Sequence, residues 1–175
     1  MGGLDKNTKA KDLMVPISLY PSLGEDEPLE NAFSLLEKTF EEGREYRNVL
    51  VLSKDAKLVG ILSMMNLIEG ILPSFLREVK GYQGQLQEHV ALSFIWQDIL
   101  SDAKRIAKSR KIKEVLRPVS ATLSPEDPIT KALYLMLNGN IMVLPVVQEG
   151  KVLGVVRFVD VFTEIAKLIT GKQDG

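Results

Sequence analysis

The feature that most constrains the fold of this chain is an internal repeat. Three motifs occur twice in the same order, and each lies about 100 residues from its second occurrence. A repeat of this kind indicates two similar structural units, and it has to be recognised before secondary structure is assigned. The matching segments are residues 11–16 (KDLMVP) and 113–118 (KEVLRP), 25–29 (EDEPL) and 125–129 (PEDPI), and 57–62 (KLVGIL) and 151–156 (KVLGVV).

The repeat divides the chain into two copies, residues 8–72 and 112–170, which are separated by an insertion at residues 73–111. Each copy has roughly 60 residues, a marginal size for an independent hydrophobic core. We therefore expect the two copies to pack their sheets against each other about a pseudo-twofold axis. That arrangement creates two related clefts between the copies.

Each copy is expected to form an extended start, a helix, two strands and a second helix. In the first copy apolar residues recur at helical spacing over residues 28–42, with Pro28 suited to the first helical position and Gly43 to the stop. In the second copy Asp127 is expected to cap the corresponding helix. The expected strands cover residues 48–53, 58–62, 141–147 and 152–158, and the expected closing helices cover residues 65–72 and 160–169.

The composition excludes several classes of function. The chain has 22 basic and 23 acidic residues, no cysteine and one histidine, His89. Disulfide scaffolds, cysteine-ligated zinc and thiol nucleophiles are therefore excluded, and we expect no metal site. The near-neutral charge gives no reason to expect a nucleic-acid partner. Because no apolar run is long enough for a membrane span and the N-terminus has no signal peptide, we expect a cytoplasmic protein.

Catalytic motifs are also missing from the sequence. It contains neither a dinucleotide-binding or phosphate-binding glycine-rich loop nor a nucleophile elbow. A serine–histidine–aspartate triad would depend entirely on His89, which lies in the insertion. We expect a non-catalytic module with no required cofactor.

The repeated motifs resemble those of the cystathionine-β-synthase (CBS) domain, and a tandem pair resembles a Bateman module. The resemblance covers about 120 of the 175 residues. It implies an α+β fold of two β-α-β-β-α repeats with a helical insertion between them, assembly into a homodimer, and regulation by AMP, ADP, ATP or S-adenosylmethionine. The motifs that carry it are residues 126–128 (EDP), 144–147 (LPVV) and 154–160 (GVVRFVD) in the second copy, and the more diverged residues 49–52 (VLVL) and 60–66 (GILSMMN) in the first.

The nucleotide motif of this family is glycine, a hydrophobic residue, any residue, threonine or serine, two residues, then aspartate or asparagine. The first copy matches it with Ser63 and Asn66, whereas the second has Asp160 but carries Arg157 in place of the hydroxyl residue. An aspartate accepts two ribose hydroxyls with charge assistance, so Asn66 suggests weaker ribose binding. Arg157 could bind a phosphate through its guanidinium, or its bulk could fill the pocket.

The resemblance implies that each cleft also takes residues from the opposite copy. Arg47 and Asn48 are expected near Asp160, which gives that cleft two arginines for a polyanionic ligand. The cleft of Ser63 looks apolar and uncharged. The remaining candidates are Met142 and Val143 for the Ser63 cleft, and Tyr20 and Thr122 at the extended starts.

The same residues also fit a structural role. The spacing of Ser63 and Asn66 is typical of a helix cap, and an aspartate at position 160 is favourable near a helix N-terminus without any ligand. The alternative hypothesis is therefore a ligand-free dimerisation or interaction scaffold that acts through the inserted helix.

The insertion is expected to contain a helix over residues 85–109 with a broad apolar stripe. Six cations follow within ten residues, from Lys104 to Lys113. The helix either packs on the repeats or across a dimer, or it docks on an unidentified protein partner.

Overall fold

The computed structural model describes residues 7–44, 46–72 and 99–171. They belong to two compact units. Of the described residues, unit 1 comprises residues 7–21, 54–58 and 119–171, and unit 2 comprises residues 22–44, 46–53, 59–72 and 99–118. Both units combine strands with helices, so the expected α+β class is confirmed.

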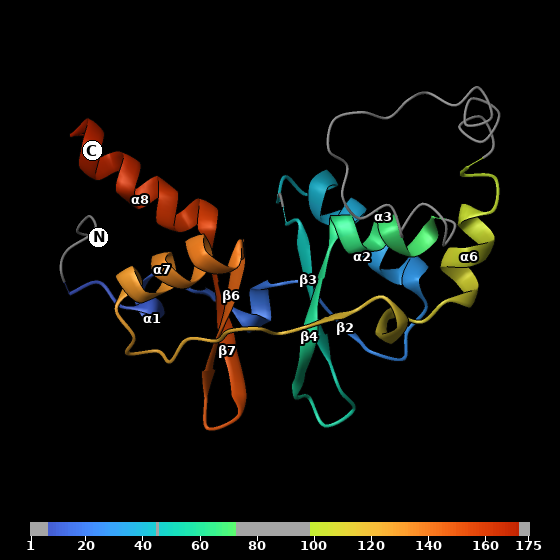
Figure 1. Ribbon diagram of the computed structural model, residues 1–175, viewed down its shortest axis with the longest axis horizontal. Helices are drawn as coiled ribbons and strands as arrows, with labels where there is room; N and C mark the ends of the chain where they lie inside the picture. The colour runs from blue at the N-terminus through green and yellow to red at the C-terminus, as the bar shows by residue number, and fades with distance from the viewer. Residues whose placement is uncertain (1–6, 45, 73–98, 172–175) are drawn as a thin grey trace. The chain divides into compact units, whose positions relative to one another are not determined.

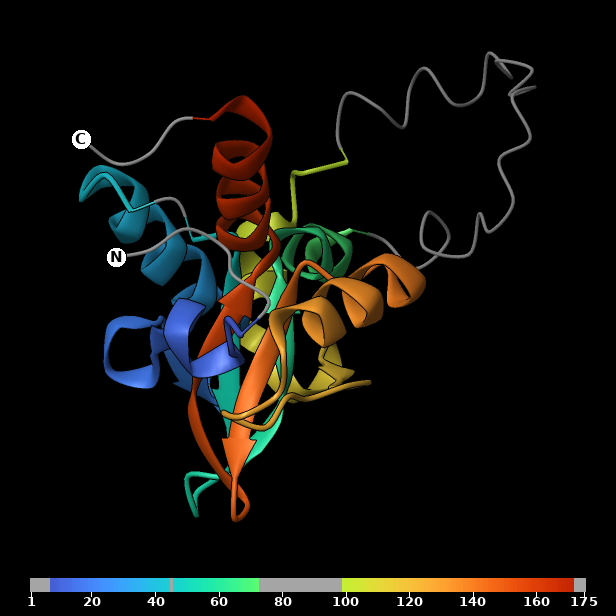
Figure 2. The ribbon, with the colours of Figure 1, turned by 90° about the vertical axis from the view of Figure 1, so that its left-hand side faces the viewer.

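Unit 1 contains a three-stranded sheet in the order β1-β7-β6. Strands β6 and β7 form a long antiparallel hairpin, and in Figure 2 this hairpin, orange to red, runs down from helices α7 and α8. The elements of the unit are α1 (Ala10–Leu13), β1 (Val15–Pro16), the 3-10 helix η1 (Ile17–Leu19), α7 (Ile129–Gly139), β6 (Val143–Gln148), β7 (Lys151–Arg157) and α8 (Phe158–Thr170).

Unit 2 contains a four-stranded sheet in the order β2-β3-β4-β5 (Figure 1). Strand β2 runs parallel to β3, and the short strand β5 runs antiparallel to β4. The elements of the unit are β2 (Ser22–Gly24), α2 (Leu29–Glu41), β3 (Asn48–Leu52), β4 (Leu58–Ser63), α3 (Met64–Ile71), α6 (Ala103–Ser109), the 3-10 helix η2 (Ile112–Glu114) and β5 (Arg117–Pro118).

The two copies of the repeat exchange their opening segments. Strand β1 precedes the first copy in the sequence but pairs with β7 of the second, with Val15 opposite Val155. Strand β5 precedes the second copy but pairs with β4 of the first, with Arg117 opposite Ile61. Each compact unit is therefore built from segments of both copies.

Backbone hydrogen bonds anchor both exchanged segments beside the first helix of the copy that receives them. In unit 1 the N–H of Ala10 donates to the carbonyl of Asp127 at 2.8 Å. In unit 2 the N–H of Ile112 donates to the carbonyl of Glu27 at 3.0 Å. Ala10 and Ile112 occupy matching positions of the repeat, and both are fully buried. The exchanged segments thus contribute to the core of each unit.

Lysine–carboxylate contacts accompany each exchanged segment. Lys9 and Lys11 both bind Glu126, and Lys113 binds Asp26 at 2.9 Å. Hydrogen bonds from Lys11 and then Lys9 lower the pKa of Glu126 to about 2. These side chains are exposed to solvent, so each contact contributes little to stability.

The starts of the two long helices differ from the prediction. Helix α2 begins at Leu29 and α7 at Ile129, so the prolines before them lie one position outside the helices. The prediction that Asp127 caps α7 was wrong. Its carboxylate instead accepts the N–H of Ser124 at 2.8 Å and binds Lys131 at 2.7 Å. Asp127 therefore closes the turn that leads into the helix.

Over residues 99–109, the helix of the insertion is shorter than predicted. Residues 73–98, which hold His89 and most of that prediction, lie outside the described residues. Residues 99–102 form turns, and only α6 is helical. Helix α6 packs against α2 and α3, with Ala107 buried. This part of the insertion is integrated into unit 2.

Among the described residues, no helix combines the length and the hydropathy that a membrane crossing requires.

Two glycines permit the exchanged strands to approach. A Cβ atom at Gly60 would lie 2.6 Å from the carbonyl oxygen of Arg117 in β5. A Cβ atom at Gly154 would overlap the carbonyl oxygen of Val15 in β1. Both contacts involve backbone, which cannot move aside as a flexible side chain can. A residue without a side chain is therefore required at both positions.

We expect Gly154→Ala to lower the free energy of unfolding by about 2–3 kcal/mol, because the added methyl group forces β1 away from β7. Urea unfolding followed by circular dichroism measures the change. Gly43→Ala serves as the control, since φ there is +72° and no neighbour lies within 4 Å of the added Cβ. That variant should lose only about 1 kcal/mol, from backbone strain. Equal losses in the two variants would contradict the close approach.

Candidate functional site

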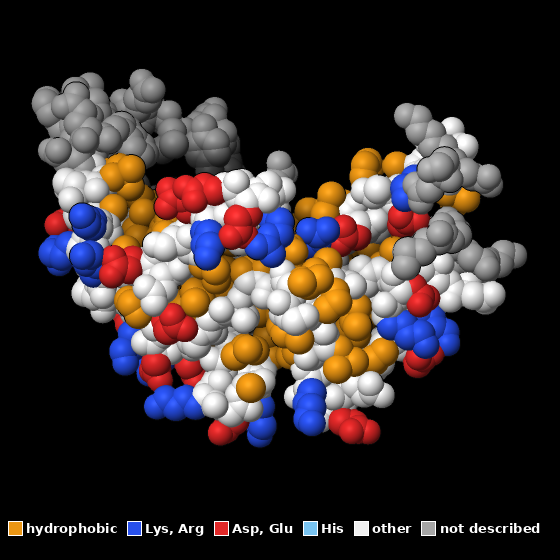
Figure 3. Space-filling view, turned by 180° about the vertical axis from the view of Figure 1, so that it is seen from behind, with side chains coloured by type: hydrophobic (Ala, Val, Ile, Leu, Met, Phe, Trp, Pro, Cys, Tyr) orange, Lys and Arg blue, Asp and Glu red, His pale blue; other side chains and the backbone are white. Residues whose placement is uncertain are grey.

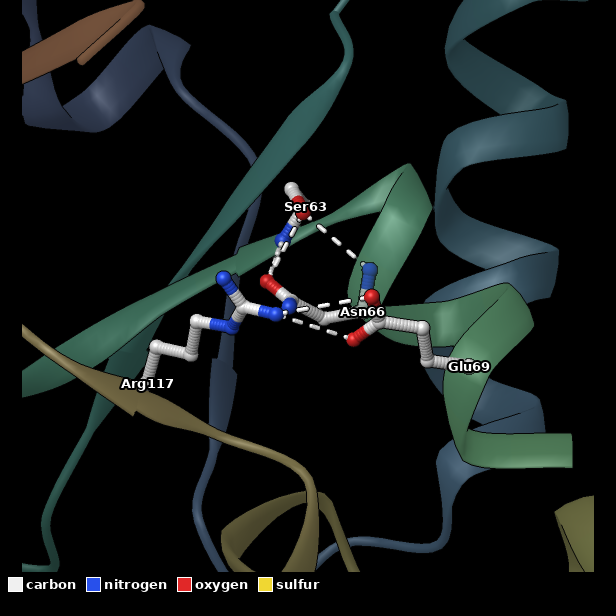
Figure 4. Close-up of polar contacts among 4 residues, drawn as sticks. All are labelled: Ser63, Asn66, Glu69 and Arg117. Atoms are coloured by element: carbon white, nitrogen blue, oxygen red, sulfur yellow. Dashed lines mark hydrogen bonds and ion pairs between the residues drawn. The ribbon is translucent and has the colours of Figure 1, made fainter. Parts of the chain in front are cut away.

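In unit 2 a serine and an asparagine form a capping box where β4 passes into α3 (Figure 4). The N–H of Asn66 donates to the hydroxyl oxygen of Ser63 at 3.1 Å. The Oδ1 atom of Asn66 accepts the N–H of Ser63 at 3.2 Å and its hydroxyl at 2.7 Å. Asn66 is only 5% exposed. The polar oxygens of this motif are therefore engaged in starting the helix.

An ion pair lies beside this capping box. The Nη2 atom of Arg117 in β5 is 3.1 Å from one carboxylate oxygen of Glu69 in α3 and 3.4 Å from the other, as Figure 4 shows. An exposed ion pair therefore lies next to Ser63 within unit 2, and the predicted character of the Ser63 cleft stays a prediction. Arg117 was not among the predicted site residues, because the exchange of segments brings it to β4. Arg117 lies opposite Ile61 in the antiparallel pair of β5 and β4, and this pairing places it near Ser63.

In unit 1 the matching positions hold an arginine and an aspartate. Arg157 is the residue before α8, and Asp160 lies in the first turn of that helix. The Nε atom of Arg157 donates to Oδ2 of Asp160 at 2.6 Å, and Nη2 donates to Oδ1 at 2.5 Å. The two side chains are 26% and 23% exposed. The guanidinium thus folds back onto the carboxylate in a two-bond fork.

The fork is a third arrangement of Arg157, in addition to phosphate binding and filling of the pocket. The side chain binds the residue that was expected to hold the ribose, three positions along the same segment. Asp160 nevertheless keeps further acceptor sites, because a carboxylate has about four lone-pair positions and the fork uses two. The aspartate also interacts favourably with the helix dipole of α8.

The residues before the central strands lie beside these motifs within each unit. In unit 2 the N–H of Met64 donates to the carbonyl of Arg47 at 3.1 Å, and Asn48 begins β3. In unit 1 the N–H of Phe158 donates to the carbonyl of Met142 at 2.8 Å. Val143 follows Met142 and lies opposite Arg157 in the β6–β7 ladder. The predicted contacts of these residues with the motif of the opposite copy stay predictions.

The two candidates at the extended starts differ in accessibility. Tyr20 is 4% exposed, and its N–H donates to the carbonyl of Ile17 at 3.2 Å. Thr122 is exposed and precedes Leu123, which forms an isolated parallel bridge with Val146. Thr122 is therefore openly accessible to a ligand, whereas only a small part of Tyr20 is exposed. In the part of the chain that the structure describes, no group of three or more acidic or histidine side chains is arranged to hold a metal ion.

Comparison with known proteins decides the family. The family model of the CBS domain matches residues 10–73 and 112–167. The chain belongs to the CBS-domain family. Its two matched regions coincide with the two copies of the repeat, which confirms a tandem CBS pair.

Related proteins and structures agree with this assignment. The uncharacterized protein MJ1426 of Methanocaldococcus jannaschii is 32% identical over 158 residues, 83% of this chain and 84% of that protein. The CBS domain of a CBS domain-containing membrane protein from Sphaerobacter thermophilus superposes with a TM-score of 0.63 at 19% identity, over 90% of this chain and 88% of that one. The CBS domain of a bacterial CNNM/CorC family Mg²⁺ transporter, solved in complex with ATP, gives a TM-score of 0.64 at 16% identity, over 92% and 89%.

We expect Ser63→Ala to lower the free energy of unfolding by about 1 kcal/mol in the absence of ligand, because the variant loses the oxygen that caps α3. Thermal and urea unfolding measure this loss. Ser34→Ala, at an exposed position inside α2, is the matched control and should be neutral or slightly stabilising. If both variants unfold like the wild type, Ser63 does not act as a cap.

Proposed function

We propose that this CBS pair is a regulatory module that senses an adenosine-containing ligand, AMP, ADP, ATP or S-adenosylmethionine. The observation that carries the proposal is the position of Asp160. It occupies the aspartate position of the nucleotide motif at the start of α8, and its side chain remains partly exposed. The ATP complex of the structurally similar CNNM/CorC domain supports the ligand class.

The two motifs are unequal as ligand sites. Asn66 is buried, and its Oδ1 atom is engaged by Ser63, so ribose hydroxyls compete with the cap for that acceptor. Asp160 is charged, has free acceptor positions and stands next to a cation that can bind phosphate. We propose the Asp160 motif as the main ribose site. The further candidate ligand contacts are Arg47, Asn48, Tyr20, Thr122, Met142 and Val143.

Binding without turnover is the role that we propose for the ligand. CBS pairs are generally non-catalytic regulatory modules, and the repeat motifs account for the polar residues at the helix starts. The proposal requires no cofactor beyond the sensed ligand itself. Turnover of an adenosine compound by the purified protein would contradict it.

We expect Asp160→Ala to weaken binding of AMP and ATP roughly 10- to 150-fold, the range for loss of charge-assisted hydrogen bonds. Asn66→Ala should weaken binding less. Isothermal titration calorimetry on the two variants measures the loss of affinity. The site is wrongly assigned if Asp160→Ala binds like the wild type while Asn66→Ala loses binding.

Exposed apolar side chains favour a second proposal, that the protein forms a homodimer. Apolar groups reach the surface between the charged ones in Figure 3. On α8, Val159, Phe162 and Ile169 recur at helical spacing and are 55%, 59% and 77% exposed. On the adjacent α7, Tyr134 and Leu137 are 66% and 65% exposed. A second copy of the chain would remove this surface from water, as the scaffold hypothesis also requires.

We expect light scattering at micromolar concentration to give twice the 19.5 kDa of the monomer. Phe162→Lys should shift the mass toward the monomer, because a lysine opposes burial of the α8 face. Circular dichroism checks that this variant is folded. A wild-type mass near 19.5 kDa would refute the dimer.

A further inference from the structure

The fork between Arg157 and Asp160 has a consequence for ligand choice. The residue that stands at the hydroxyl position of the motif occupies two of the acceptor sites of the aspartate that is proposed to bind ribose. In unit 2 the matching residue, Ser63, makes a neutral contact with Asn66 instead. The two polar residues of the second motif are therefore bound to each other by a strong, charge-assisted contact.

A ligand that binds Asp160 has to break this contact, and the cost of breaking it depends on the charge of the ligand. Each side chain of the pair is about a quarter exposed, so breaking the fork removes two charge-assisted bonds that water screens only in part. A neutral nucleoside that binds Asp160 carries no anionic group that could replace the carboxylate beside Arg157. A phosphorylated ligand offers the guanidinium a phosphate fork as Asp160 turns to the ribose. The exchange therefore keeps the guanidinium next to an anion and the carboxylate hydrogen-bonded to ribose hydroxyls.

We infer that Arg157 makes the proposed site selective for phosphorylated adenosine ligands by holding Asp160 until a phosphate replaces it. The inference rests on the proposed function and narrows its ligand class. AMP, ADP and ATP should bind, whereas adenosine and the sulfonium cation of S-adenosylmethionine should be disfavoured. Arg157 is then a specificity-determining residue as well as a phosphate contact.

Titration calorimetry with adenosine, AMP and ATP tests the inference on the full chain and on Arg157→Thr, which restores the hydroxyl of the family motif. Adenosine should bind Arg157→Thr about 10-fold more tightly than the wild type, because Asp160 is released, and ATP should bind about 10-fold more weakly. The ratio of the adenosine and ATP affinities should thus change by about 100-fold. Arg157→Lys keeps the charge without the fork, so its ratio should lie between the two.

The control variant breaks a second ion pair on the same helix. Lys167 binds Glu164 at 3.1 Å with the same three-residue spacing and with side chains 31% and 18% exposed. Lys167→Thr should leave the ratio of the adenosine and ATP affinities as in the wild type. Unfolding curves for both threonine variants show that each is folded under the titration conditions.

The possible outcomes separate the two proposals. If Arg157→Thr weakens adenosine and ATP by the same factor, Arg157 only positions Asp160 and the inference is wrong while the proposed function stands. The inference also fails if the ratio is unchanged in Arg157→Thr or shifts equally in Lys167→Thr. If no compound binds the wild type or any variant at millimolar concentration, the proposed function is wrong and the inference falls with it.

Discussion

In both compact units, a strand from the other copy of the repeat packs closely against a glycine, and the rest of the unit depends on this contact. Gly154 allows β1 to lie against β7, and Gly60 allows β5 to lie against β4. Both strands bring a buried residue and flanking lysine–carboxylate contacts with them. Because each unit is completed by the opening segment of the other copy, neither 60-residue copy has to supply a whole core alone.

The two motifs differ in their contacts although they occupy matching positions of the repeat. Where β4 meets α3, Ser63 and Asn66 cap the helix, and an exposed ion pair from the exchanged segment lies beside them. Where β7 meets α8, Arg157 and Asp160 replace that cap with an ion pair. The first motif caps a helix with neutral side chains, whereas the second contains a charged pair, Arg157 and Asp160. The proposal of one main ligand site rests on this asymmetry.

The sequence predicted the repeat, the α+β class and the elements of each copy, because periodicity, prolines and glycines act locally. The exchange of β1 and β5 could not be predicted in this way, since similarity to a repeat does not show which copy a short opening strand joins. The capping role of Ser63 and Asn66 was one of two open readings. The fork of Arg157 on Asp160 was not foreseen, because rotamer choice depends on the local geometry where β7 passes into α8.

Hydrogen–deuterium exchange on a chain that lacks residues 1–16 tests the exchange of segments most directly. Our account predicts that amides of α7, β6 and β7 lose protection, although they lie more than 100 residues away in the sequence. The amides of β3 and β4 should remain protected, because their sheet is completed by β5. Loss of protection confined to β2, β3 and α2, next to the deletion in the sequence, would contradict the account.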